Sequence, residues 1–138
     1  RRRGRAASTR AMIEARTPVL VGAAAVQQRL DDPAVAKEPV ELMIDALEGA
    51  AADAGSRALL AQATSVRVPR GFWDYSDPGR LIAARFDAAG ARTQVAEIGV
   101  LQTTPLGAAA RDIAAGRDEV VLIAGGEAKY RSLRAQIT

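Results

Sequence analysis

The chain has 138 residues, 49% of them hydrophobic and 4% aromatic, which is enough to fill one core and form one domain. It contains no cysteine and no histidine, so disulfides, thiolate metal sites, a cysteine nucleophile and the usual general base of acyl transfer are excluded. The formal charge is +3, but subtracting the five arginines of the first eleven residues leaves −2, and no apolar run approaches the length of a membrane span.

Residues 1–11 are basic and small and show no apolar periodicity. Such a run can bind the phosphates of nucleic acid or anionic lipid, or resemble a transit peptide. Because the rest of the chain offers no basic or aromatic nucleic-acid surface, we predict a disordered tail that precedes a start at Met12. Residues 12–138 then form the domain, with neither a nucleic-acid partner nor a membrane partner.

The first elements of the domain are a predicted strand that runs into a turn of small residues over 17–26, a loop over 27–37 and a helix that begins at Pro39 and closes at Gly55. Apolar residues recur at helical spacing on one face of this helix: Val40, Met43, Ile44, Leu47, Ala51 and Ala54. Acids occupy the opposite face: Glu41, Asp45, Glu48 and Asp53. Acids in this pattern can bind a metal, but a solvated helix face explains them more simply, and we predict no metal site.

A short helical turn over 56–62 and a strand over 63–68 come next, followed by a loop over 70–78. Asp77 is predicted to cap a helix that Pro78 begins and Gly90 ends. The inward stripe of this helix is predicted to comprise Ile82, Phe86 and Ala89.

The loop over 70–78 carries Phe72, Trp73 and Tyr75, which are three of the five aromatic residues in the chain. Such side chains can stack on an adenine or line an acyl tunnel. They can equally seal the edge of the domain or form a subunit contact, and the sequence leaves these alternatives open.

The C-terminal third is predicted to contain a strand over 91–98, a helix over 103–116, a strand over 120–124 and a last helix over 128–138. The five apolar residues from Val120 to Ala124 are typical of a strand covered on both faces. Gly125 and Gly126 allow a sharp turn after it. The face of the first of these helices is predicted to show Leu106, Ala109, Ala110 and Ile113. Leu133 and Ile137 are spaced to share one side of the last helix, where we expect an exposed apolar patch large enough to drive association.

The alternation of strands and helices predicts an α/β fold with a mainly parallel sheet and helices on both faces, in three layers. Gly22-Ala-Ala-Ala-Val26 is not the glycine fingerprint of a dinucleotide site, and the chain has no phosphate-binding Gly-x-x-x-x-Gly-Lys motif. A nucleotide-binding protein of the Rossmann type is therefore only a distant alternative.

Several stretches of the chain carry a resemblance to a known family. The stretch Ala108–Glu127, which ends in Ala-Gly-Gly-Glu, resembles the thiolase segment that follows the nucleophile, and Arg16–Gly22 resembles the first strand of thiolases. Phe72-Trp73, Asp77–Arg80 and Ala89-Gly90 are similar to the sterol-carrier-type thiolase-like proteins of actinobacteria. The resemblance covers about residues 12–138 and implies a thiolase-like N-terminal half-domain.

One departure from the thiolase pattern concerns catalysis. Counted back from Ile113 without gaps, the place of the thiolase cysteine falls at Gly99. Thr103 and Thr104 are poor substitutes because a hydroxyl needs an activating base, and we predict helix caps there instead. The sequence therefore supplies no catalytic residue.

The resemblance implies a cytoplasmic thiolase-like protein, related to acetyl-CoA acetyltransferases, that handles acyl-CoA thioesters in lipid metabolism without thiolase activity of its own. Coenzyme A or an acyl-CoA is the implied ligand, and no covalently bound cofactor is expected. The alternatives are part of a thiolase-fold aldolase acting on sterol side-chain CoA thioesters, or a non-catalytic structural subunit. The implied protein partners are a second copy or another thiolase-fold chain.

Overall fold

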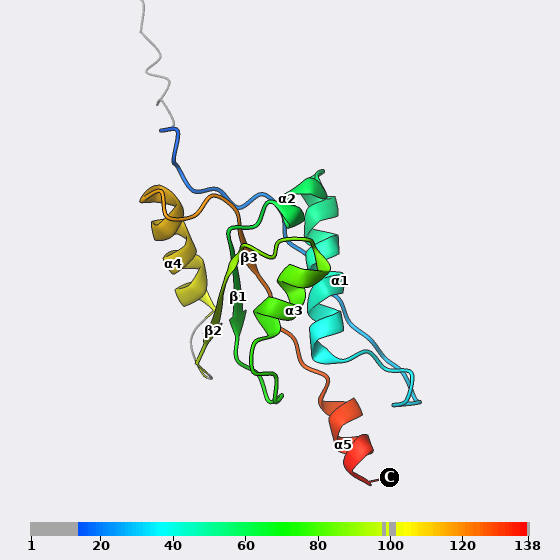
Figure 1. Cartoon of the computed structure of the whole chain (residues 1–138). Helices are drawn as coiled ribbons and strands as arrows, with labels where there is room; N and C mark the ends of the chain where they lie inside the picture. Colours follow the sequence, from blue (N-terminus) through cyan, green and yellow to red (C-terminus); the bar gives the residue numbers. More distant parts are fainter. Residues whose placement is uncertain (1–13, 98, 100–101, 138) are drawn as a thin grey trace, which may run out of the picture.

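The structure is a computed structural model that describes residues 14–97, 99 and 102–137 (Figure 1). Its centre is a three-stranded sheet in the order β2-β1-β3, made of β1 (Ser65–Pro69), β2 (Arg92–Ala96) and β3 (Val121–Ile123). Both strand pairs are parallel, with Val66 opposite Thr93 on one side and Leu122 on the other. The predicted α/β class and parallel sheet are confirmed, while the predicted tail at 1–11 lies outside the described residues.

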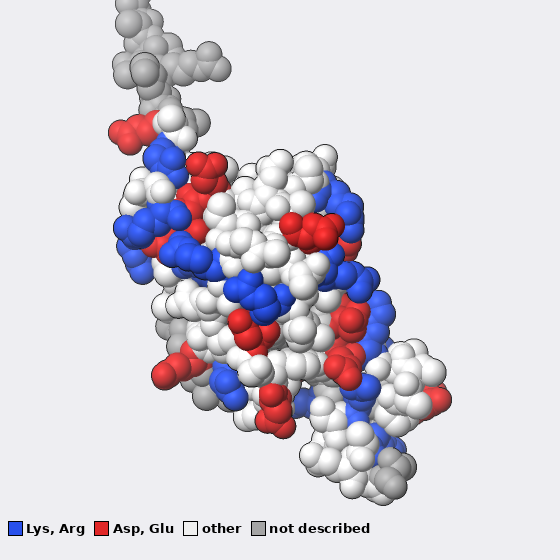
Figure 2. Space-filling view, in the orientation of Figure 1, with Lys and Arg blue, Asp and Glu red and all other residues white. Residues whose placement is uncertain are grey.

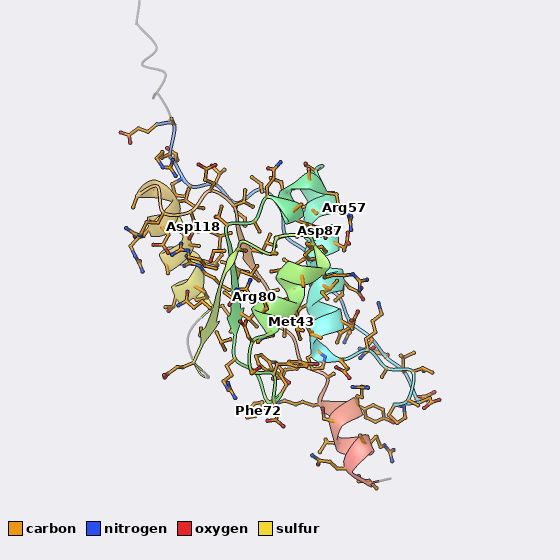
Figure 3. The ribbon with its side chains drawn as sticks, in the orientation of Figure 1. Met43, Arg57, Phe72, Arg80, Asp87 and Asp118 are labelled. Atoms are coloured by element: carbon orange, nitrogen blue, oxygen red, sulfur yellow. The ribbon has the colours of Figure 1, made fainter. Side chains whose placement is uncertain are left out.

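One face of the sheet carries the apolar core. It is covered by α1 (Pro39–Asp53), the short α2 (Ala58–Ala61) and α3 (Pro78–Arg85). Met43 of α1 is fully buried and lies between α1 and α3 in Figure 3. The core on this face combines strand and helix residues: Val66, Val68, Leu122, Ile44, Leu47 and Ile82. Each of these large side chains contributes roughly 1.5–3 kcal/mol by leaving water.

Helix ends show how local chemistry sets the element boundaries. Gly55 takes a φ of 73° after α1, and the N–H groups of Gly55 and Ser56 donate to the carbonyls of Ala52 and Ala51. This is a Schellman end, which requires the left-handed conformation that glycine adopts without strain. Gly116 closes α4 (Thr103–Ala114) in the same way, with a φ of 76°.

The predicted end of α3 at Gly90 is wrong. The helix stops at Arg85, and Asp87 takes the left-handed conformation with a φ of 58°. Asp is one of the few residues other than glycine that tolerate this conformation. The early stop changes which side chains face the core, so Ala88 is buried while the predicted Ala89 is exposed.

The other face of the sheet is covered by α4, so the predicted three layers are confirmed (Figure 1). This face buries charge: the Arg67 guanidinium of β1 pairs with Asp118 at 2.9 Å and with Asp112 of α4 at 2.5 Å. Asp118 also pairs with Arg92 at 2.9 Å and accepts a hydrogen bond from the Thr64 hydroxyl at 3.0 Å. We call this group of five side chains the Arg67 network.

The Arg67 network gives a pH dependence that can be measured. Hydrogen bonds from Arg67 and then Arg117 lower the pKa of Asp112 from 3.8 to about 2. Because the folded pKa lies below the unfolded one, the stability from this carboxylate is complete above pH ~4 and is lost as the pH falls toward 2. We expect the urea midpoint to fall over this window and the fall to be shallower in Asp112→Asn. An identical pH profile in the variant would contradict this assignment.

The predicted strand over 17–26 is wrong: this segment carries no strand in the structure. It runs extended across α1, and the Ala23 N–H donates to the Asp53 carboxylate at 2.9 Å. Arg16 ties the start of the segment to the end of α4 by donating to the carbonyls of Ile113, at 3.0 Å, and Asp118, at 3.2 Å. A cation is favourable at this end of a helix. Only β1 pairs with β3, so the segment has no strand partner in the described sheet.

β3 has helices on both of its faces, as predicted, but the two faces are not buried alike. Leu122 and Ala124 are buried against α1, whereas Val121 and Ile123 are only half-buried on the side of α4. α4 has 12 residues, and a single helix of this length cannot cover the whole face of a three-stranded sheet. Beyond β3, α5 (Lys129–Ile137) has no buried residue and extends away from the sheet (Figure 1).

Candidate functional site

The carboxyl ends of the three parallel strands lie at one edge of the sheet. Ligands of open α/β sheets bind in the crevice outside these ends, so this edge is the candidate location of a ligand site. After Pro69, β1 leads into the loop over 70–78 that carries Phe72, Trp73 and Tyr75, which we call the aromatic loop. β2 leads through Gly99 into α4, and β3 leads into Gly125-Gly126-Glu127.

Gly99 occupies the predicted place of the missing nucleophile, in the connection from β2 to α4. Its φ is 84°, and a Cβ added there would meet no atom within 4 Å among the described residues. Residues 98, 100 and 101 lie outside the described part of the chain. Gly99 therefore provides an exposed left-handed turn at the carboxyl edge.

The start of α4 corrects the prediction that Thr103 or Thr104 caps the helix. Gln102 is the N-cap residue and makes no side-chain hydrogen bond to the helix, while Thr103 and Thr104 are its first helical residues and are exposed. The first N–H groups of a helix without such a cap remain available to water or to an anion. The helix start can therefore hold an anionic group.

A small cavity of about 60 Å³ lies beside Thr104, under α4. Its lining includes Gln94 and Ala96 of β2 and Arg67 of β1. Arg67 is the one titratable residue of that lining, and its guanidinium is held by two carboxylates. A guanidinium stays protonated, so nothing in this cavity can take a proton from the Thr104 hydroxyl.

The aromatic loop divides into a sealing part and an exposed part. Trp73 is buried and its indole N–H donates to the carbonyl of Gly126 at 3.1 Å. Tyr75 packs on the core, 5.4 Å from Trp73 between ring centroids, and its hydroxyl donates to Glu38 at 3.0 Å. That hydrogen bond, with a further one from Arg131, lowers the pKa of Glu38. Trp73 and Tyr75 thus seal the edge of the domain, which is one of the four predicted alternatives.

Phe72 is different, because 72% of it is exposed. The Lys129 ammonium lies over its ring, 4.6 Å from the centroid. The Phe72 backbone N–H donates to the Glu127 carboxylate at 2.6 Å, which holds the loop against the segment after β3. Figure 3 shows Phe72 at the end of the molecule opposite to Asp118. An exposed ring beside a cation can stack on a flat aromatic ligand.

Close packing explains two of the glycines around this loop. A Cβ on Gly126 would lie 3.2 Å from Met43 and 3.3 Å from the carbonyl oxygen of Pro39, so α1 approaches the turn directly. A Cβ on Gly71 would overlap the Glu127 carboxylate and the Trp73 indole. The Gly-Gly-Glu sequence after β3 therefore holds the aromatic loop in place, and its function here is structural.

The described residues contain no group of three or more His, Cys, Asp or Glu side chains placed to hold a metal ion. Within the same residues, no helix is both long enough and apolar enough to cross a membrane. Basic and acidic side chains are interspersed on the face shown in Figure 2. Three of the four acids of α1 make ion pairs or hydrogen bonds: Lys37 pairs with Asp45, Arg57 with Glu48, and the Ala23 N–H donates to Asp53.

A parallel sheet with helices on both faces and a glycine-rich carboxyl edge defines the class of the protein as α/β, in three layers. Neither a scan against protein-family models nor a search of curated proteins gives a match. Among solved structures, the chain is similar to a monomeric SCP2-thiolase-like protein type 1 from Mycobacterium smegmatis, with a TM-score of 0.64 and 29% identity. The match covers 83% of this chain and 24% of that one. The chain therefore has the fold of part of a thiolase-like protein.

Proposed function

We propose that the chain is a thiolase-like module that binds an acyl-CoA thioester in lipid metabolism and supplies no nucleophile. One combined observation carries the proposal: the chain shares its fold with an SCP2-thiolase-like protein over 83% of its length, yet has no cysteine or histidine. Covalent acyl transfer requires an activated nucleophile, whereas binding requires only a cleft and suitable contacts.

Two features of the carboxyl edge suit the parts of coenzyme A. The exposed Phe72 ring can stack on an adenine, while the Lys129 ammonium beside it can pair with a phosphate. The uncapped start of α4 offers N–H groups for a carbonyl or phosphate oxygen. We assign the nucleotide to Phe72 and the thioester to the side of α4 and Gly99.

Titration with CoA and acetyl-CoA tests the binding proposal. Trp73 is the single tryptophan of the chain, so its fluorescence reports on the loop beside Phe72, and calorimetry gives the affinity independently. Loss of one stacked base costs about 1–3 kcal/mol, so Phe72→Ala should weaken CoA binding about 5- to 150-fold. The matched control is Leu81→Ala, which removes another exposed side chain, on α3, and should bind CoA normally. No CoA binding at millimolar concentration would contradict the proposal.

Incubation with acetyl-CoA should leave the chain without a covalent acetyl group. Thr103 and Thr104 are exposed at the start of α4, and the cavity beside Thr104 holds no base. Intact mass spectrometry should therefore show one unmodified species after hours of incubation. Stoichiometric acetylation of either threonine would show that an activated hydroxyl exists.

A structural subunit is the second candidate function, and the exposure of α5 favours it. Leu133 is 58% exposed and Ile137 is 74% exposed, at helical spacing on a helix with no buried residue. Exposed apolar residues of this kind mark contact surfaces, here for a second copy or another thiolase-fold chain. Sedimentation should show association at micromolar concentration that Leu133→Glu with Ile137→Glu abolishes. A monomer at all concentrations, alone and mixed with a thiolase-fold protein, would exclude this role.

A further inference from the structure

A cavity of about 290 Å³ lies between the loop that precedes α1 and the start of α5, two segments at the same end of the molecule (Figure 1). More than half of its lining residues are apolar or aromatic: Val26, Leu30, Ala36, Leu42, Ala128 and Tyr130. The lining residues with a formal charge are Glu127, Lys129 and Arg131. A mainly apolar cavity with a few charged groups suits an amphipathic ligand.

Two sets of polar contacts hold the walls of this cavity in place. The Gln28 side-chain amide donates to the Lys37 carbonyl and accepts from the Lys37 N–H, both at 2.9 Å, which closes the loop before α1. The Tyr130 hydroxyl donates to the Asp31 carbonyl at 3.3 Å and joins the start of α5 to the same loop. Because these contacts fix the walls without filling the space between them, the cavity is preformed, as ligand sites usually are.

Among the charged groups of the lining, one cation has no carboxylate partner. Arg131 pairs with Glu38 at 3.1 Å, and the Glu127 carboxylate accepts from the Phe72 N–H at 2.6 Å. Lys129 makes no ion pair within the described part of the chain, and its ammonium lies over the Phe72 ring instead. A cation–π contact at an exposed ring contributes a factor of only about two to five to an equilibrium constant, so a carboxylate can draw the ammonium away.

We propose that this cavity binds a medium-chain carboxylate, whose charge pairs with Lys129 and whose hydrocarbon chain contacts Leu30 and Leu42. A phosphate alone leaves the apolar lining without a partner, and an uncharged chain leaves Lys129 without one. Lys129 is also the group that pairs with a CoA phosphate in the proposed function, so a bound carboxylate competes for it and weakens CoA binding. This regulation of CoA binding, but not the carboxylate site itself, rests on the proposed function.

Titration with octanoate, followed by NMR of the methyl groups, tests the carboxylate site. The control ligand is 1-octanol, which has the same chain without the charge. We expect octanoate to shift the signals of Leu30, Leu42 and Ala128 and to bind at least about fivefold more tightly than 1-octanol. Hexanoate should bind about tenfold more weakly than octanoate, because each buried methylene contributes about a factor of four. Equal binding of octanoate and 1-octanol, or shifts confined to Leu133 and Ile137 of α5, would overturn the proposal.

Substitutions identify the group that holds the carboxylate. Lys129→Gln removes the charge, so octanoate should bind this variant no more tightly than 1-octanol does. Its matched control is Lys37→Gln, because Lys37 is the other lysine of the chain, pairs with Asp45 and does not line the cavity. Ala36→Leu fills the space and should weaken octanoate binding at least about tenfold. If that variant does not fold, the two ligands on the unaltered chain still decide. Equal weakening in both lysine variants would overturn the role of Lys129.

Competition between octanoate and CoA separates a failure of this inference from a failure of the proposed function. Saturating octanoate should weaken CoA binding at least about threefold, and CoA should weaken octanoate binding by the same factor, because coupling between two ligands is reciprocal. CoA binding without octanoate binding overturns the carboxylate site alone. Octanoate binding without CoA binding overturns the proposed function alone. Binding of both ligands with no mutual effect overturns the regulation through Lys129.

Discussion

Leu122→Asp should abolish the cooperative unfolding transition of the chain. Leu122 is buried in the middle of β3, in the same cluster as Met43 and Val66. An unpaired carboxylate there must either be desolvated or take up a proton, at a cost of several kcal/mol in addition to the lost apolar burial. Since domains are stable by only about 5–15 kcal/mol, this loss approaches the whole stability. Circular dichroism during heating should show no sharp transition.

Val121→Asp is the matched control, because it introduces the same carboxylate one residue away on the opposite face of the strand. Val121 is half-buried and borders an open groove beside β3, so its carboxylate can reach water. We expect this variant to fold and to lose about 1–3 kcal/mol, within the usual range for single substitutions. Equal loss of folding in both variants would mean that the two faces of β3 are buried alike.

The parts of the fold that could be predicted from the sequence are those that neighbouring residues determine. The start of α1 at Pro39, the cap at Asp77 and the stops at Gly55 and Gly116 depend on residues within one helical turn. Asp77 accepts from the Arg80 N–H at 3.0 Å, as its place before Pro78 predicts. Local sequence signals of this type predict the structure correctly because tertiary contacts rarely oppose them.

The errors arise where a distant partner decides the structure. The segment 17–26 has the composition of a strand, but a strand needs a neighbour to bond with, and the segment lies on α1 instead. The ion pairs buried between the sheet and α4 were also not predicted. Alternation in β1 does contain that signal, because Ser65 and Arg67 share one face while Val66 and Val68 share the other. An arginine in such a strand indicates a buried carboxylate partner, and Asp118 is that partner.

The candidate site shows the same division between local and distant effects. The absence of a nucleophile at Gly99 follows from the sequence alone, since no cysteine exists in the chain. The two roles of the aromatic loop could not be assigned without the fold. Trp73 and Tyr75 find hydrogen-bond partners far along the chain, at Gly126 and Glu38, whereas Phe72 remains exposed. Long-range partners of this kind leave no periodic trace in the sequence.

Asp118→Ala should cost about 3–5 kcal/mol, because it leaves the buried Arg67 guanidinium with a single carboxylate partner. Asp118 is fully buried, so water cannot replace the lost bonds. Urea unfolding at neutral pH measures the change in the free energy of unfolding. Arg92→Ala is the control: its guanidinium pairs with the same carboxylate but is 62% exposed, so its removal should cost no more than about 1 kcal/mol.

A double variant separates the cost of an unpaired charge from the value of the ion pair itself. Replacing Arg67 by Met and Asp118 by Leu removes both charges and fills the same space with apolar atoms. Buried ion pairs exchanged for apolar residues in this way are often neutral, so the double variant should recover most of the stability lost in Asp118→Ala. Asp112 keeps its ion pair with Arg117 at 2.7 Å and access to water, so it does not become a new unpaired buried charge. A double variant less stable than Asp118→Ala would show that the Arg67 network stabilises the fold by direct attraction, beyond avoiding a buried unpaired charge.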